Sequence, residues 1–318
     1  MIHWAGRQQE QSSGYWQSLW GLVYPWLVYQ GMGMLVTFVF AWIMVLMNPA
    51  FVPTSGSLTD YFLQFSEEVK AYYLPLAAIS CALSIPLLLL FFFRDRKQEI
   101  REGFVLESWE KTGAGSFALC LLCGISASIV LNHCLIYSGV YEWLSEGYAD
   151  SAQMMFQGNL WLELLTICLL TPLVEELIFR GLIFRRLRWS LDAKAAILTS
   201  ALLFAVFHGN LLQGIYAFAM GFLFAFVYER THSLWAPILF HLGANVVSVL
   251  MTEVEGFKKI YAKENEKLFL LLTFAMMVLF VISFYLFYVR VRPAGIECKD
   301  SADTLAHIQE DEYGKRTI

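Results

Sequence analysis

Charged side chains are scarce in this chain, and their scarcity excludes most soluble architectures. Only 15% of the 318 residues are Asp, Glu, Lys or Arg, whereas 58% are hydrophobic. Soluble domains carry about 25% charged residues to cover their surface. The 22 basic residues are outnumbered by 27 acidic ones, and no basic run is long enough to neutralise a row of phosphates. We therefore expect that the chain is neither a soluble domain nor a nucleic-acid-binding protein.

Cysteine is also sparse, and its placement excludes a disulfide framework. Of the six cysteines, all but Cys298 lie in apolar stretches, where cysteine is typical of small buried side chains. Cys120 and Cys123 form C-x-x-C, but their apolar surroundings offer no charge that would activate a thiol. The chain also lacks the H-E-x-x-H motif of zinc peptidases and any Gly-rich phosphate loop.

Long apolar runs dominate the sequence instead. A helix needs about 20 apolar residues to cross a bilayer core about 30 Å thick. Eight runs meet this need approximately, at residues 21–48, 71–93, 115–140, 159–180, 194–209, 211–229, 234–252 and 267–290. The predicted fold class is therefore all-α, a polytopic transmembrane helix bundle with about eight spans.

The distribution of basic residues predicts the orientation of this bundle. When the N-terminus is placed inside, most Lys and Arg residues fall on the inner side, as the positive-inside rule expects. We predict a multi-pass protein of a bacterial plasma membrane with both termini cytoplasmic. Three regions are expected: spans one to three in 1–154, a polar-bearing core in 155–255, and the last span with a polar cytosolic tail in 256–318.

Two shorter segments are amphipathic. Leu58, Phe62 and Phe65 recur with helical spacing, and residues 182–189 alternate apolar side chains with arginines. Either segment could lie flat on the membrane surface. The second could equally extend the fourth span.

The fourth span carries three charges, each of which costs about 2.5 to 3.5 kcal/mol at the bilayer centre. Glu176 and Arg180 are four residues apart and share a helix face, whereas Glu175 points elsewhere. One carboxylate is thus paired, and the other is available for chemistry. An ion pair that only joins helices would explain Glu176 and Arg180 but not Glu175. Pro172 removes a helical hydrogen bond and is predicted to kink the span.

Two later spans carry histidines. Phe204 lies one helical turn before His208, and its ring should support the imidazole. His241 and Asn245 share a face of the seventh span, where Gly243 permits close helix approach. Each histidine alone is typical of packing, but together with Glu175 they indicate one site. Helix rise places this site in the middle to cytoplasmic half of the membrane.

The three motifs E-E-x-x-x-R, F-x-x-x-H and H-x-x-x-N together resemble the CAAX-protease and bacteriocin-processing (CPBP/ABI) family of intramembrane glutamate endopeptidases. The resemblance covers roughly residues 155–255. It implies hydrolysis of a peptide bond in a membrane-associated protein or peptide by a glutamate-activated water, without a cofactor. The roles that it implies are Glu175 as general base, His208 as a holder of the water, His241 and Asn245 as oxyanion donors, and Glu176, Arg180 and Phe204 as supporting residues.

Other functions stay open at this stage. Glu175, His208 and His241 could instead be zinc ligands with an open fourth position. The chain could also be a non-catalytic membrane scaffold or regulator, or a transporter with a proton relay, although no inverted repeat favours transport. The substrate could be a prenylated CAAX protein, a bacteriocin or pheromone precursor, or a membrane-bound regulator. The oligomeric state is not indicated.

Overall fold

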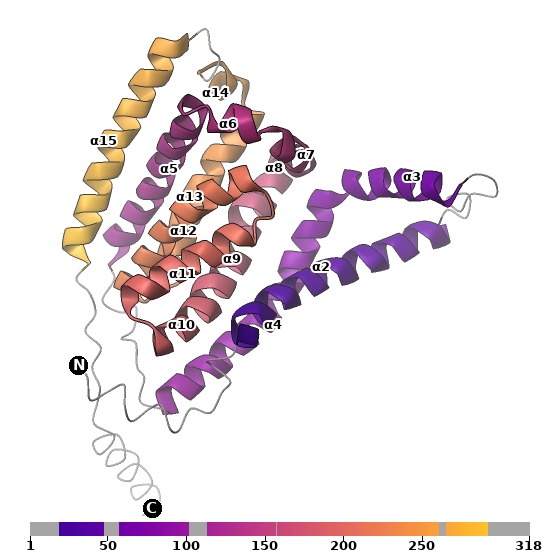
Figure 1. Ribbon diagram of the computed structural model, residues 1–318, viewed down its shortest axis with the longest axis horizontal. Helices are drawn as coiled ribbons and strands as arrows, with labels where there is room; N and C mark the ends of the chain where they lie inside the picture. Colours follow the sequence, from indigo (N-terminus) through magenta and orange to yellow (C-terminus); the bar gives the residue numbers. More distant parts are fainter. Residues whose placement is uncertain (1–18, 48–56, 102–112, 157, 261–264, 292–318) are drawn as a thin grey trace, which may run out of the picture.

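The computed structural model describes residues 19–47, 57–101, 113–156, 158–260 and 265–291, and every regular element in these ranges is helical (Figure 1). The elements are α2 (Leu19–Met47), α3 (Leu58–Ala71), α4 (Tyr73–Arg101), α5 (Ala114–Tyr137), α6 (Val140–Leu144), α7 (Glu146–Met155), α8 (Leu160–Glu163), η3 (Leu164–Leu170), α9 (Thr171–Glu176), η4 (Leu177–Phe184), α10 (Arg185–Ser190), α11 (Ala193–Val206), α12 (Leu211–Thr231), α13 (Trp235–Glu253), α14 (Glu255–Ile260) and α15 (Glu266–Arg290). The all-α polytopic bundle is confirmed. The predicted polar tail lies outside the described residues.

Six of the described helices are long and apolar enough to cross a membrane: α2, α4, α5, α12, α13 and α15. The other two predicted spans differ in form. The fourth becomes a continuous helical run from α8 to α10, in which the π-helical segments η3 and η4 alternate with α-helix. The fifth becomes α11, whose 14 residues reach only about 21 Å. The span predicted to reach residue 209 was too long, because the apolar run continues through Phe207 after α11 has ended.

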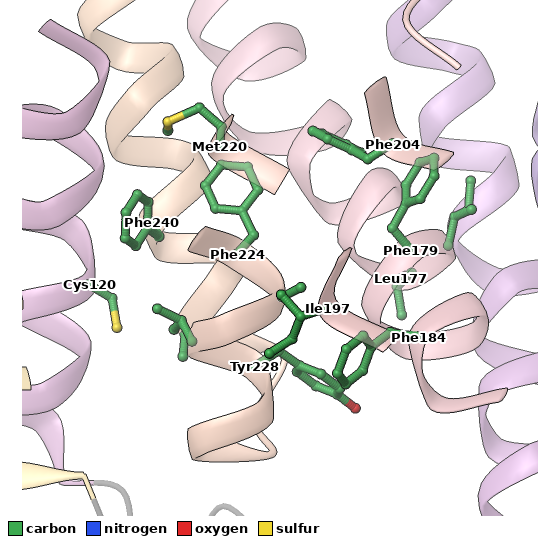
Figure 2. Close-up of a cluster of buried hydrophobic side chains, with 14 of the residues drawn as sticks. Cys120, Leu177, Phe179, Phe184, Ile197, Phe204, Met220, Phe224, Tyr228 and Phe240 are labelled. Carbon is green, nitrogen blue, oxygen red and sulfur yellow. The ribbon is translucent and has the colours of Figure 1, made fainter. Parts of the chain in front are cut away.

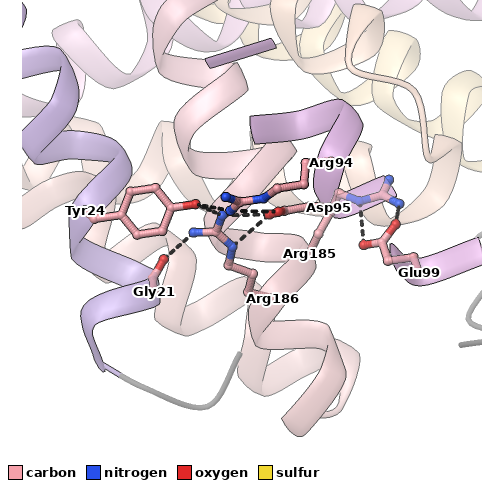
Figure 3. A network of polar contacts seen from close by, with 7 residues as sticks. All are labelled: Gly21, Tyr24, Arg94, Asp95, Glu99, Arg185 and Arg186. Carbon is pink, nitrogen blue, oxygen red and sulfur yellow. Dashed lines mark hydrogen bonds and ion pairs between the residues drawn. The ribbon is translucent and has the colours of Figure 1, made fainter. Parts of the chain in front are cut away.

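Residues 182–189 extend the fourth span and do not form a separate surface helix. Arg185 and Arg186 are buried. Arg186 donates to Asp95 of α4 (2.6 Å), to Tyr24 Oη of α2 and to the carbonyl of Gly21, while Arg185 pairs with Glu99 (Figure 3). The sequence analysis described these arginines only as the polar side chains of an amphipathic segment. In the structure they join α10 to α4 and α2.

Glycine allows α13 to pack directly on α5. A Cβ atom at Gly124 would lie 1.9 Å from the carbonyl oxygen of Phe240, and one at Gly243 would lie 2.6 Å from that of Leu121. Neither contact is sterically possible, so both positions require glycine. This close approach fixes the position of α13, the helix that carries His241 and Asn245.

An aromatic core fills the space between α13, α12, α11 and the fourth helical run. Phe204, Phe224 and Phe240 are almost completely buried, and the rings of Phe224 and Phe240 meet edge to face at 5.3 Å (Figure 2). Phe179 meets Phe204 in the same manner at 4.9 Å. These rings surround the inner charges and exclude lipid from them.

Candidate active site

The predicted site residues lie around one cavity of about 430 Å³. Glu175, His208, His241 and Asn245 all line it, together with Phe204. Three sequence motifs from α9, the end of α11 and α13 are therefore brought together. Glu176 and Arg180 do not line the cavity and lie behind its wall.

Glu176 and Arg180 form a fully buried ion pair. Arg180 Nη1 lies 2.9 Å from Glu176 Oε1, and Arg180 Nη2 donates to the carbonyl of Gly221 at 2.9 Å. The guanidinium also lies over the ring of Phe204 at 4.7 Å and over that of Phe224 at 5.2 Å. The i, i+4 pairing expected from the sequence is present, and it anchors the fourth helical run to α12.

Gly221 is a site residue that the sequence reasoning missed. A Cβ atom there would lie 2.9 Å from the ring of Phe204 and 3.4 Å from Arg180 Nη2. Its missing side chain leaves room for the guanidinium to reach the main chain of α12. The role of this glycine is visible only once the position of Arg180 is known, because the other glycine of α12, Gly214, has no contact with Arg180.

His241 lies between the two glutamates. Its Nδ1 is 3.1 Å from Glu176 Oε1, and its Nε2 is 3.7 Å from Glu175 Oε2. The ring stacks on Phe224, with centroids 4.7 Å apart and planes at 24°. Because Glu176 Oε1 already accepts a hydrogen bond from Arg180, it acts as an acceptor for His241 as well. Nδ1 is thus the donating nitrogen, and Nε2 faces Glu175.

Glu175 is the carboxylate that the fold leaves available. Its side chain is 21% exposed, whereas that of Glu176 is fully buried. Among the described residues it has no hydrogen-bond donor of its own, and the 3.7 Å approach of His241 is longer than a hydrogen bond. The difference between two adjacent glutamates follows from the helix, which turns them about 100° apart.

His208 is held in the turn between α11 and α12. Its Nδ1 lies 2.6 Å from the carbonyl of Phe204, so Nδ1 carries the proton and Nε2 is left as an acceptor. Gly209 has φ +79°, and the side chain of Asn210 caps α12 by accepting from Gln213 N–H. Non-helical backbone inside a membrane protein is tolerated where it lines a cavity, and this turn does.

One side-chain amide hydrogen of Asn245 forms a hydrogen bond that joins two helices. Its Nδ2 donates to the carbonyl of Ile167 in η3 at 2.7 Å. A primary amide has two N–H groups, so a second donor remains for a group in the cavity. No other bond of Asn245 is formed within the described ranges.

Helices α2 and α4 also contribute cavity residues that the sequence did not single out. Trp26 of α2 stacks on Phe207 beside His208, with centroids 4.6 Å apart and planes at 12°. Tyr29 of α2 and Tyr73 of α4 line the cavity, and Tyr29 Oη lies 3.6 Å from Cys81 Sγ. Aromatic residues are common in membrane helices, so no local signal marks these three.

The alternative zinc ligands do not form a cluster. His241 approaches Glu175, but no group of three or more His, Cys, Asp or Glu side chains within the described ranges is arranged to hold a metal ion. The Nδ1 atom of His208 is directed to the main chain of α11, at the carbonyl of Phe204. In this arrangement the three side chains do not form a tetrahedral zinc site with three protein ligands, and independence of metal stays a prediction.

Comparison with known proteins now adds to the geometry. Residues 157–247, which contain every predicted site residue, match the family model described as "Type II CAAX prenyl endopeptidase Rce1-like". Over 80 residues the chain is 41% identical to "Putative membrane peptidase YdiL" of Bacillus subtilis (strain 168). That match spans 25% of this chain and 33% of the relative. No solved structure matches the chain.

These matches confirm, for this segment, the resemblance to the CAAX-protease family drawn from the three motifs. Together with the six apolar helices, they identify the chain as an integral, multi-pass membrane protein. The match spans only a third of the relative's length, so the activity of this chain belongs, with its mechanism and substrate, to the proposal below.

Proposed function

We propose that this protein is an intramembrane endopeptidase in which Glu175 activates the attacking water. The observation that carries the proposal is the unequal environment of the two adjacent glutamates. Glu176 is tied to Arg180 at 2.9 Å and to His241 at 3.1 Å, whereas Glu175 faces the cavity without a hydrogen bond from a described residue. An unpaired carboxylate in a cavity is what general-base chemistry requires.

The reaction can be written from these groups. Glu175 removes a proton from water while the water oxygen bonds to the substrate carbonyl carbon. His208 orients the same water through its accepting Nε2. The proton on Glu175 then passes to the amide nitrogen as the C–N bond breaks, which returns Glu175 to its carboxylate form. One water is consumed, and a carboxylic acid and an amine are released.

The developing oxyanion requires donors, and two candidates lie on the same helix. Asn245 has one amide hydrogen beyond that given to Ile167. His241 donates from Nδ1 to Glu176, so it can donate from Nε2 only as a cation, which the two flanking carboxylates would stabilise. The geometry supports the oxyanion role of both residues. Each donor of this kind is worth roughly 2.7 to 4 kcal/mol in other peptidases.

The cavity wall favours an uncharged segment of polypeptide. Among its lining residues Glu175 is the one Asp or Glu, and none is Lys or Arg. A substrate carboxylate or phosphate would find no Lys or Arg among the described lining residues, and the His241 cation is already flanked by the two adjacent glutamates, so cleavage within a chain is favoured over removal of a C-terminal residue. The aromatic rings that line it, including those of Phe179, Phe204 and Phe224, suit apolar side chains next to the scissile bond.

The test is cleavage by the purified protein in detergent or liposomes. A pool of apolar, membrane-anchored peptides is incubated with the protein, and products are identified by mass spectrometry. We expect internal cleavage that survives a strong chelator and is lost with Glu175→Gln. Cleavage that stops with chelator and returns with zinc would instead favour the metal-dependent alternative. Absence of any product with the wild-type protein, while the fold is intact, would favour the scaffold.

A further inference from the structure

From the level of the catalytic groups, the residues that line the active-site cavity continue toward one end of the helix bundle. On α13 it runs from His241 to Ser248, toward the C-terminal end of the helix, and on α12 from Phe224 back to Leu212. On α4 it includes Tyr73, in the first turn. Because neighbouring helices are antiparallel, these three directions lead to the same end of the bundle, where α6 and α7 lie (Figure 1).

The short helices at that end form the mouth of the cavity. Tyr141 of α6 and Tyr148 of α7 line it, as do Met154 and Met155 at the end of α7. Tyr141 is 41% exposed. The cavity therefore begins at Glu175 in the interior and reaches the surface beside α6 and α7.

The opposite end of the bundle is closed by paired charges. Asp95 and Glu99 of α4 are buried against Arg186 and Arg185 (Figure 3). Arg185 also donates to Tyr228 of α12 at 3.1 Å. None of these residues lines the cavity. A substrate arriving from that end would have to separate buried ion pairs, which costs several kcal/mol for each pair.

We infer that substrate and water reach Glu175 from the α6 and α7 end, which is the extracytoplasmic end when the arginine-rich end is cytoplasmic. The inference rests on the proposed function and names its substrate class. This class comprises exported or membrane-anchored polypeptides that present an uncharged, apolar segment at the outer membrane surface. A C-terminal motif held at the cytoplasmic surface would meet the closed end.

Accessibility to an impermeant maleimide tests this inference without using activity. Ala217 of α12 lines the cavity and is 2% exposed, and Ala225, about two turns along the same helix toward the arginine-rich end, is fully buried outside it. Ala217→Cys and its matched control Ala225→Cys are made in a variant without native cysteines. Trp143→Cys on α6 and Lys194→Cys on α11 mark the two ends of the bundle.

The expected result is labelling of Ala217→Cys from the same side as Trp143→Cys, in intact cells and not in inside-out vesicles. Ala225→Cys should not react from either side. Ala77→Cys, on the α4 wall of the cavity, repeats the measurement on a second helix. The pattern should persist when Glu175→Gln is added, because access does not require catalysis.

Three outcomes would overturn the inference. Labelling of Ala217→Cys from the Lys194→Cys side would place the opening at the other end. Absence of labelling at both Ala217→Cys and Ala77→Cys, while Trp143→Cys reacts, would mean that no opening exists there. Reaction of Trp143→Cys only in inside-out vesicles would make the mouth cytoplasmic and reject the extracytoplasmic substrate class. A protein that fails the cleavage test but shows the expected labelling would reject the proposed function alone.

Discussion

The side-chain amide of Asn245 donates a hydrogen bond to the main-chain carbonyl of Ile167, 2.7 Å away. Ile167 lies in η3, where the amide of Thr171 bonds five residues back, to Thr166. The next donor in this register would be residue 172, and Pro172 has no N–H. Asn245 supplies the missing donor. The proline therefore leaves the Ile167 carbonyl of the π-helical segment without a main-chain donor, and this carbonyl accepts the hydrogen bond from Asn245.

Replacing Asn245 with Ala should leave the Ile167 carbonyl without its donor and cost about 1 to 3 kcal/mol of stability. Catalysis should fall as well, through the loss of an oxyanion donor. Pro172→Ala restores a main-chain N–H. In the Asn245→Ala background it should recover part of the thermal stability but none of the activity. Thermal unfolding in detergent checks the first part, and an Asn245→Ala protein as stable as the parent would contradict it.

Replacing Gly124 with Ala should disturb the position of α13. The new methyl group would overlap the carbonyl of Phe240, so α13 must shift or the helices must separate, at a cost of about 1 to 3 kcal/mol or more. His241, next to Phe240, would move with the helix, and peptidase activity should drop together with stability.

Gly31→Ala is the matched control for Gly124→Ala. Gly31 lies in α2, and among the described residues no atom outside the adjoining part of that helix lies within 4 Å of the position that a methyl group would occupy there. Alanine should therefore be neutral or stabilise the helix by up to about 1 kcal/mol. Equal melting temperatures for Gly124→Ala and the parent would show that the close approach of α5 and α13 is not needed.

Replacing Glu176 with Gln should lower the stability of the fold rather than act directly on the chemical step. It leaves the buried guanidinium of Arg180 without a countercharge, which costs about 3 to 5 kcal/mol. Glu67→Gln removes an exposed partner of Lys70 and should cost no more than about 1 kcal/mol. The yield of detergent-solubilised protein and its melting temperature compare the two. A Glu176→Gln protein as stable as Glu67→Gln would refute the structural role of this pair.

Local features of the site were predictable, because helical spacing determines them. The four-residue separation of Glu176 and Arg180 predicts their pairing, and the structure forms it at 2.9 Å. The one-turn separation of Phe204 and His208 predicts that their rings meet, and their centroids are 4.6 Å apart. The meeting of three distant motifs is not a local feature: polar side chains within apolar spans indicated one site, and the family resemblance supplied the role of each residue.

Contacts between distant segments could not be predicted from the sequence. Asp95 lies 91 residues before Arg186, and without their proximity in space the arginine is only a polar residue of an amphipathic segment. The stacking of Trp26 on Phe207 is equally invisible, since both are ordinary residues of apolar helices. Pro172 indicated a kink, but whether a helix kinks or widens into a π segment depends on the partner that takes the free carbonyl.

Orientation in the membrane is tested by reporter fusions. Fusions after Arg101 and after Lys194 should report a cytoplasmic location, and a fusion in the segment of residues 141–157 should report an external one. This follows from the basic residues near the first two positions and from the absence of Lys and Arg in that segment. A cytoplasmic signal from residues 141–157 would invert the assignment of both ends.

The most direct measurement of the central claim compares the peptide cleavage rate of Glu175→Gln with that of the parent, under single-turnover conditions. Glutamine keeps the size of the side chain but cannot accept the proton, so the rate should fall about 10²-fold to 10⁴-fold. The melting temperature should stay within a few degrees of the parent, because Glu175 holds no buried partner at hydrogen-bond distance. A folded Glu175→Gln protein that cleaves at the parental rate would contradict the assignment of Glu175 as the base.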